Sequence, residues 1–167
     1  FPTRRSSDLY PHKEDLLMLE HDGILNAFLA VVLTSHPELT GLAGYFTVEC
    51  AFLYRILNDP PVAALYADVI NVPSLRKRYC RAHHALYQHF CPEISDSEAA
   101  WTSTVAMSAL EFELGDEGLF PDFEESIKKI FRAKLLFEEK NPDDFEKTIC
   151  LSVKNGIALA QKLKQAY

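Results

Sequence analysis

The fold of this chain is decided by ELTGLAGYFTVECAFLYRILNDPP, the segment from Glu38 to Pro61. Its apolar residues recur every three or four positions, the spacing that places side chains on one face of an α-helix. The segment closes on Asp59, a good N-cap residue, and Pro60, which suits the first turn of a helix. We therefore predict a helix over 38–58 followed at once by another. The residues of the apolar face are Leu39, Leu42, Phe46, Cys50, Leu53 and Leu57.

The same periodicity extends outward in both directions, and it is interrupted at each step by residues that end or begin helices. Val72-Pro73 and Cys91-Pro92 are typical stops, and Ser95 with Glu98 has the spacing of a capping box, in which each side chain binds the other's backbone amide. We therefore predict seven helices joined by short turns, forming one all-α bundle. The six further helices are expected at about 12–35, 60–71, 73–90, 95–114, 122–140 and 142–167.

Composition favours the same fold class. The chain has 167 residues, of which 48% are hydrophobic and 25% charged, as in one compact domain. Leu and Ala together number 39 against 23 for Val, Ile and Thr, which favours helix over strand. The longest apolar run, Ala27 to Leu33, is far shorter than the roughly 20 residues that cross a bilayer, so no membrane-spanning protein is expected.

Charge and cysteine content limit the partners of the chain. Its net charge is -7, which disfavours nucleic acid and anionic lipid as partners of the molecule as a whole. The four cysteines form no CxxC pair, so we expect neither a disulfide framework nor a zinc site, and a reducing cytoplasm fits best. We expect no cofactor and no bound metal.

Residues 1–9 are treated separately from the rest. They read FPTRRSSDL and resemble the conceptual translation of a common short-read sequencing adapter. We therefore expect them to be non-native, with the native sequence of a truncated gene fragment covering 10–167. Without these residues 15 basic and 23 acidic residues remain, and the net charge becomes -8.

Familiar catalytic motifs are absent from the sequence. It contains no HExxH, GxSxG, GxGxxG or GxxxxGK[ST], and no glutamate is followed by a histidine three residues later, as in di-iron bundles. No catalytic residue is assigned, and an enzyme is not expected.

Two polar residues stand among aromatic ones. Glu49 follows Tyr45 and Phe46 on the central predicted helix, and it is either the polar anchor of an aromatic-lined ligand pocket or a residue that points outward or pairs with a base from a neighbouring helix. His83 lies one turn from Tyr79 and Tyr87, and an ordinary buried histidine is the alternative to a functional one. The basic residues Arg76, Lys77, Arg78 and Arg81 are interpreted as a solvated face.

The predicted helix at 95–114 is rich in Ala, Ser and Thr around Trp101, Val105 and Phe112. Small residues allow another helix to approach closely, so this helix is either central in the core or part of a subunit interface. The last predicted helix is the second candidate for such an interface.

The segment Tyr10-Pro11-His12-Lys13-Glu14-Asp15-Leu16-Leu17 resembles the boundary of TetR-family transcriptional regulators, where the DNA-binding helix-turn-helix meets a long connecting helix. Tyr10 stands where Phe is usual, and His12 where Ser or Asn is commoner. The stretch from Glu49 to Asp59, followed by Leu65-Tyr66, is similar to one in the ligand domains of some members.

The resemblance implies a TetR-like effector-sensing and dimerisation domain over 10–167, whose helix-turn-helix is missing. Lys13 would contact a DNA phosphate, operator DNA would bind only through the missing domain, and the chain would form a homodimer. The expected residues around the small-molecule effector are Tyr45, Glu49, Phe52, Tyr66, Tyr79, His83 and Tyr87. The expected dimer-interface residues are Trp101, Val105, Ala109, Phe112, Val153, Ile157 and Ala160. The alternatives are a small helical metal-binding protein or enzyme using Glu49 and His83, and a protein-interaction module without a ligand.

Overall fold

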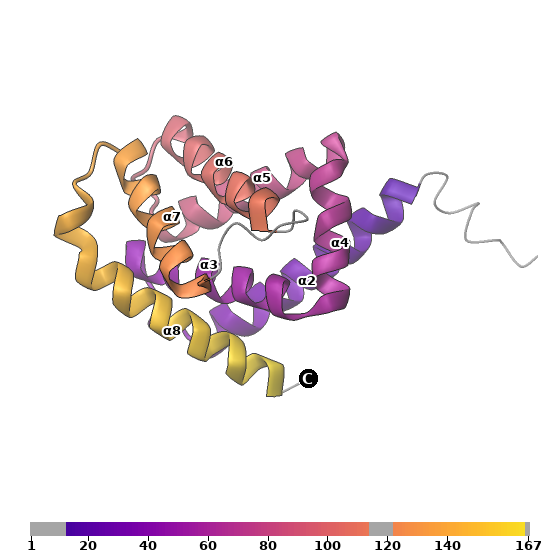
Figure 1. The fold of residues 1–167 in the computed structure, drawn as a ribbon, viewed down its shortest axis with the longest axis horizontal. Coiled ribbons are helices and arrows are strands. Elements are labelled where there is room, and N and C mark those ends of the chain that lie inside the picture. The colour runs from indigo at the N-terminus through magenta and orange to yellow at the C-terminus, as the bar shows by residue number, and fades with distance from the viewer. Residues whose placement is uncertain (1–12, 114–121, 166–167) are drawn as a thin grey trace, which may run out of the picture.

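The computed structural model describes residues 13–113 and 122–165, and within these ranges helices are the only regular secondary structure (Figure 1). The prediction of an all-α fold is confirmed, with no strand in the described part of the chain. Residues 1–12, which include the segment expected to be non-native, lie outside the description. The elements are α2 (Lys13–Ser35), α3 (Gly41–Asn58), α4 (Pro60–Asn71), α5 (Pro73–Phe90), α6 (Asp96–Glu113), α7 (Phe123–Phe137), the 3-10 helix η1 (Pro142–Phe145) and α8 (Glu146–Gln165).

Helix boundaries depart from the sequence prediction at three places. The central helix begins at Gly41 instead of Glu38, because Gly41 has a φ of 59° after the extended Thr40. The helix expected over 122–140 ends at Phe137, and Glu139 then takes a left-handed φ of 54°. The last predicted helix is divided, because the turn of η1 precedes α8.

The predicted caps have mixed outcomes. Asp59 occupies the N-cap position of α4, but its side chain forms no capping hydrogen bond, contrary to the expectation. Asp122, which was not predicted as a cap from the sequence, caps α7, since its carboxylate accepts a hydrogen bond from the backbone N–H of Glu125 at 3.2 Å. The proposed capping box at Ser95 cannot be followed to its partner, because the Glu98 side chain lies outside the described residues.

Helix α3 lies at the centre of the bundle, and α8 packs along it (Figure 1). The two helices meet at Gly156, where a Cβ atom would lie only 2.6 Å from the Cys50 Cβ and 2.7 Å from the Thr47 carbonyl oxygen. The Ser152 hydroxyl donates to the Ala43 carbonyl at 3.1 Å across the same contact. Glycine at 156 is therefore required by close approach of the two helices.

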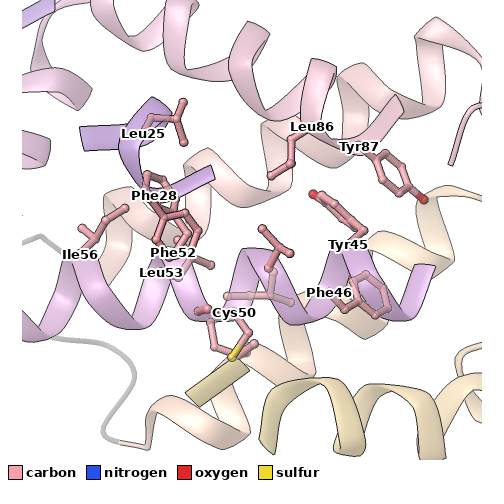
Figure 2. Packing of buried hydrophobic residues seen from close by; sticks show 14 of the residues in the cluster. Leu25, Phe28, Tyr45, Phe46, Cys50, Phe52, Leu53, Ile56, Leu86 and Tyr87 are labelled. Atoms are coloured by element: carbon pink, nitrogen blue, oxygen red, sulfur yellow. The ribbon is translucent and has the colours of Figure 1, made fainter. Parts of the chain in front are cut away.

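The apolar core surrounds α3 on its other sides. Phe28 of α2 packs on Phe52 with ring centroids 5.1 Å apart, and Figure 2 shows this pair beside Ile56. Toward the other end of α3, Phe46 stacks on Phe131 of α7 at 4.1 Å. Residues 44–53 are all buried, so α3 is covered on every face.

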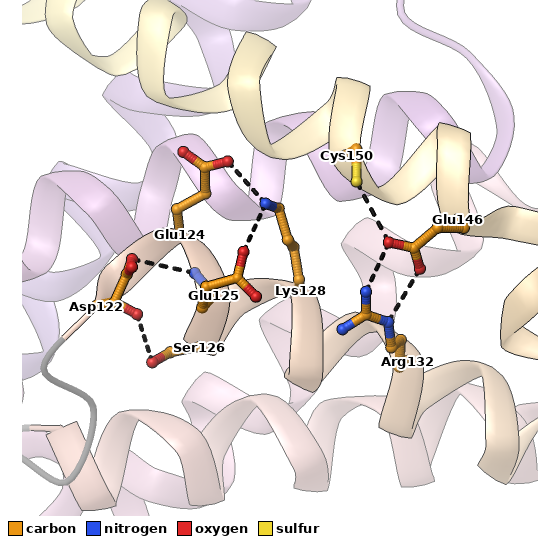
Figure 3. A network of polar contacts seen from close by, with 8 residues as sticks. All are labelled: Asp122, Glu124, Glu125, Ser126, Lys128, Arg132, Glu146 and Cys150. Atoms are coloured by element: carbon orange, nitrogen blue, oxygen red, sulfur yellow. Dashed lines mark hydrogen bonds and ion pairs between the residues drawn. The ribbon is translucent and has the colours of Figure 1, made fainter.

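Polar contacts at the surface connect α7 to α8 (Figure 3). The Arg132 guanidinium donates to both carboxylate oxygens of Glu146, at 3.0 and 2.6 Å. These hydrogen bonds lower the pKa of the Glu146 carboxyl, and the Cys150 thiol, which also donates to it, acts in the same direction. None of the helices in the described part of the chain has the length and apolar character to cross a membrane.

Candidate functional site

The seven residues expected around an effector all come together inside the bundle. They lie on three helices, and each is at most 1% exposed. The helical repeat explains the convergence, because residues three or four positions apart share one helix face. They are Tyr45, Glu49 and Phe52 on α3, Tyr66 on α4, and Tyr79, His83 and Tyr87 on α5. We call this set the tyrosine cluster.

The ring contacts of the tyrosine cluster form two groups, one of Phe52, Tyr66, Tyr79 and His83 and the other of Tyr45 and Tyr87. Tyr66 meets Tyr79 edge to face with centroids 5.7 Å apart, and Tyr79 lies 4.3 Å from the His83 ring. At the other end Tyr45 lies 4.3 Å from Tyr87, and Figure 2 shows these two side chains turned toward each other between α3 and α5. The cluster therefore offers large aromatic area with polar atoms at several points, a combination typical of small-molecule sites.

A buried ion pair lies within this cluster. Lys134 of α7 and Glu49 of α3 are both fully buried, and the Lys134 ammonium donates to Glu49 Oε1 and, at 3.0 Å, to the Tyr45 hydroxyl. Among the interpretations of Glu49 that the sequence left open, an outward-pointing side chain is contradicted, and pairing with a base from a neighbouring helix is what the structure shows. Sequence reasoning missed Lys134, although it stands at helical spacing on the apolar face with Ile127 and Phe131.

One carboxylate oxygen of Glu49 does not take part in the contact with Lys134. Glu49 Oε2 is buried and accepts no hydrogen bond from any described residue. His83 Nδ1 is 3.8 Å from the other oxygen, Oε1, which is beyond hydrogen-bonding distance. A buried acceptor without a donor costs about 1–3 kcal/mol, so native proteins rarely keep one without a reason.

Burial shifts the acid–base properties of the cluster toward neutral forms. It lowers the pKa of Lys134, and the nearby Glu49 carboxylate only partly opposes that shift. Burial raises the pKa of Tyr45 and Tyr79 well above the usual range, with the charge of Glu49 acting in the same direction. The phenols therefore stay protonated at neutral pH and can act as hydrogen-bond donors.

Tyr87 belongs to a second polar network, at the end of α7. Its hydroxyl donates to Glu138 Oε1, to which the Thr102 hydroxyl of α6 also donates at 3.3 Å. Lys140 donates to the other Glu138 oxygen at 2.7 Å. This network joins α5, α6 and the end of α7, and it commits the Tyr87 hydroxyl to a structural contact. No signal in the sequence singled out Glu138.

The metal-binding alternative rests on Glu49 and His83. In residues 13–113 and 122–165 no group of three or more His, Cys, Asp or Glu side chains converges as metal ligands would. Glu49 and His83 do lie together, but one oxygen of the carboxylate already binds Lys134.

Two of the expected dimer-interface residues on α8 lie inside the chain. Val153 is fully buried and Ala160 is 4% exposed, and α8 packs against α3. Val153 also supplies the carbonyl that accepts a weak hydrogen bond from the Cys50 thiol at 3.5 Å. The sequence pattern could not separate an apolar face covered by the same chain from one covered by a partner. Ile157 is half-buried against the core.

The expected interface residues on α6 have a different environment. Trp101 is 53% exposed and stacks in parallel on Phe137 of α7, itself half-exposed, with centroids 5.5 Å apart. Val105 is half-buried. The side chains of Ala109 and Phe112, and that of Lys13, the expected phosphate contact, lie outside the described residues.

The basic residues of α5 lie mostly at the surface, as interpreted from the sequence. Lys77, Arg78 and Arg81 are exposed, Arg76 is half-buried, and Arg78 pairs with Asp22 of α2.

In comparisons with protein-family models, curated proteins and solved structures, nothing matches this chain.

Proposed function

We propose that this chain is the effector-sensing and dimerisation domain of a TetR-like transcriptional regulator of the cytoplasm. In this proposal a small molecule binds at the tyrosine cluster and changes the arrangement of the helices. That change controls DNA binding by a helix-turn-helix domain. The effector and the DNA then act on one conformational equilibrium, and each alters the affinity for the other.

The observation that carries the proposal is the buried oxygen Glu49 Oε2, which accepts no hydrogen bond from the described residues and lies among aromatic side chains. A ligand with a hydrogen-bond donor would satisfy that oxygen, and the surrounding rings would cover the ligand's apolar surface. The resemblance of the segment around Lys13 to TetR-family regulators supplies the regulatory context.

Ligand binding is tested by thermal unfolding with a panel of phenols and aromatic amines. A ligand at 100 times its Kd stabilises the folded state by about 2.7 kcal/mol, which raises the melting temperature of a chain this size by about 5–10 °C. The ligand-induced shift is compared between the wild type and Glu49→Gln, in which an amide replaces one carboxylate oxygen. Glu125→Gln on exposed α7 surface is the matched control.

The sensor proposal predicts stabilisation of the wild type and of Glu125→Gln, with a clearly smaller shift in Glu49→Gln. Equal shifts in all three proteins would place binding elsewhere and count against the site. Stoichiometric metal in the purified protein would favour the alternative of a metal-binding protein or enzyme that uses Glu49 and His83.

Dimerisation is tested by light scattering at micromolar concentration. We expect the mass of a dimer for the wild type and of a monomer for Trp101→Glu, because the half-exposed Trp101 presents apolar area on α6. Leu19→Glu changes a residue of α2 with similar exposure, and it should leave the dimer intact. A monomeric wild type would refute the dimer.

DNA binding is expected to require a helix-turn-helix domain and not residues 10–167 alone. Residues 10–167 carry a net charge of -8, so the sensor domain should show no specific binding to operator DNA at physiological salt. Nanomolar, sequence-specific binding in a mobility-shift assay would overturn this expectation.

A further inference from the structure

A cavity of about 330 Å³ opens between α2, α3 and α8, outside the tyrosine cluster. Its volume is near the lower end of the range of small-molecule sites, about 300–1,000 Å³. Its lining is apolar except for one side chain. The lining residues are Ala27, Phe28, Ala30, Val31, Arg55 and Leu163.

Arg55 is the exception, and its environment is unusual for an arginine. It is half-buried in the last turn of α3, and no described residue forms an ion pair or hydrogen bond with its guanidinium. Two other arginines of the described residues form ion pairs: Arg78 pairs with Asp22, and Arg132 pairs with Glu146. A guanidinium offers two parallel N–H donors that match the geometry of a carboxylate.

We propose that this cavity binds a small amphipathic carboxylate, with the carboxylate held by Arg55 and the apolar portion held against α2 and α8. Charge complementarity selects this class of ligand, because the lining combines one cation with five apolar side chains. An anion would supply the partner that Arg55 lacks among the described residues, and an alkyl or aromatic body would cover Phe28, Val31 and Leu163.

The cavity shares one wall with the tyrosine cluster. Phe28 lines the cavity, and its ring packs on Phe52 at a centroid distance of 5.1 Å (Figure 2). Phe52 in turn contacts Tyr66, with centroids 5.8 Å apart. Occupation of the cavity would therefore fix the position of Phe28 against the cluster. The binding of a carboxylate stands independently of a regulatory role for the chain.

The proposal is tested by calorimetric titration with octanoate, and with octanol as the neutral molecule of the same chain length. Hydrogen bonds to charged groups stabilise by amounts that correspond to about a 10- to 100-fold change in Kd. We expect one octanoate per chain and at least about 10-fold weaker binding of octanol. Octanoate that does not bind at millimolar concentration, or that binds no tighter than octanol, would overturn the proposal.

Three variants locate the site. Arg55→Met keeps the apolar stem and removes the charge, so octanoate should bind about 10- to 100-fold more weakly while octanol is little affected. Arg81→Met, an exposed arginine of α5, should change neither Kd. Ala30→Trp fills the cavity from α2 and should abolish the binding of both molecules.

The Glu49→Gln variant separates this site from the tyrosine cluster. Octanoate should bind to it with the wild-type Kd, whatever the outcome of the effector experiment. Loss of octanoate binding in Glu49→Gln together with unchanged binding in Arg55→Met would assign the carboxylate to the tyrosine cluster and refute the proposal.

Discussion

Helix α3 has two faces that are buried equally well but by different means. The face toward α8 consists of small groups. Because Gly156 of α8 has no side chain, the backbone of α8 approaches Thr47 and Cys50 of α3 closely. The opposite face carries the fully buried ion pair of Glu49 with Lys134 of α7, among aromatic rings. One face depends on shape and the other on charge pairing.

The difference determines what each face tolerates. The stability of an apolar contact depends on side-chain volume. An added or lost methyl group therefore lowers the free energy of unfolding by a moderate amount, which depends on how far the neighbouring side chains can shift. A buried ion pair responds to the loss of either partner, because the remaining charge stays in an apolar interior. The polar face is therefore the more sensitive of the two, although a pair of apolar residues of similar size could replace it at little cost.

The largest expected effect is on the polar face. Lys134→Met removes the ammonium that donates to Glu49 Oε1, and we expect the free energy of unfolding to fall by about 3–5 kcal/mol. Urea unfolding followed by circular dichroism measures the change. Lys129→Met, on the exposed side of α7, is the matched control and should stay within about 0.5 kcal/mol of the wild type.

The double variant Glu49→Leu with Lys134→Met distinguishes a lost pair from lost packing. With both charges removed, stability should return to within about 1 kcal/mol of the wild type or exceed it. If the double variant is as unstable as Lys134→Met, the ion pair is not the source of the cost, and the distinction between the two faces fails.

A smaller effect is expected on the apolar face. Gly156→Ala would place a Cβ atom 2.6 Å from the Cys50 Cβ, and the resulting shift of α8 should cost about 1–3 kcal/mol. The same unfolding measurement applies. Gly23→Ala in α2 is the control, because its added Cβ meets no atom within 4 Å.

The two glycine variants should differ in sign. Gly23→Ala should stabilise the protein by about 0.5–1 kcal/mol, since alanine restricts the unfolded chain and favours helix. If Gly156→Ala stabilises the protein as much as Gly23→Ala does, α3 and α8 are not packed closely enough at this position to require glycine.

The smallest effect is expected for the exposed ion pair between Arg132 and Glu146. Arg132 lowers the pKa of Glu146, so this pair adds stability above the ordinary pKa of a glutamate and loses it as pH falls through the lowered value. In Arg132→Gln the pKa should rise toward the ordinary range, which carboxyl chemical shifts during an acid titration would report. An unchanged pKa, or a loss of stability as large as that of Lys134→Met, would contradict the contrast between exposed and buried pairs.

Much of the fold was predictable, because helix periodicity and proline stops are local signals. The range of α4 and the end of α3 agree with the prediction from Asp59-Pro60. The start of α3 was not predictable in the same way, because Gly41 takes a positive φ that a periodicity argument does not detect. The division between η1 and α8 was missed for a similar reason, since one turn of 3-10 helix has nearly the same spacing.

The candidate site was predictable in its residue types but not in its pairing. Helix spacing places Tyr79, His83 and Tyr87 on one face of α5, whichever helices surround it. The partner of Glu49 is 85 positions away in sequence, and only the packing of α7 against α3 brings Lys134 to it. The burial of Val153 and Ala160 likewise followed from the contact between α8 and α3.

The sequence by itself therefore determined the helices, their apolar faces and the chemical character of the tyrosine cluster, because all of these depend on neighbours within a few residues. The tertiary structure alone decided which charges are paired, which apolar faces the chain covers itself, and where Arg55 borders a cavity. Those outcomes depend on contacts between residues far apart in the chain, and such contacts are set by how whole helices pack.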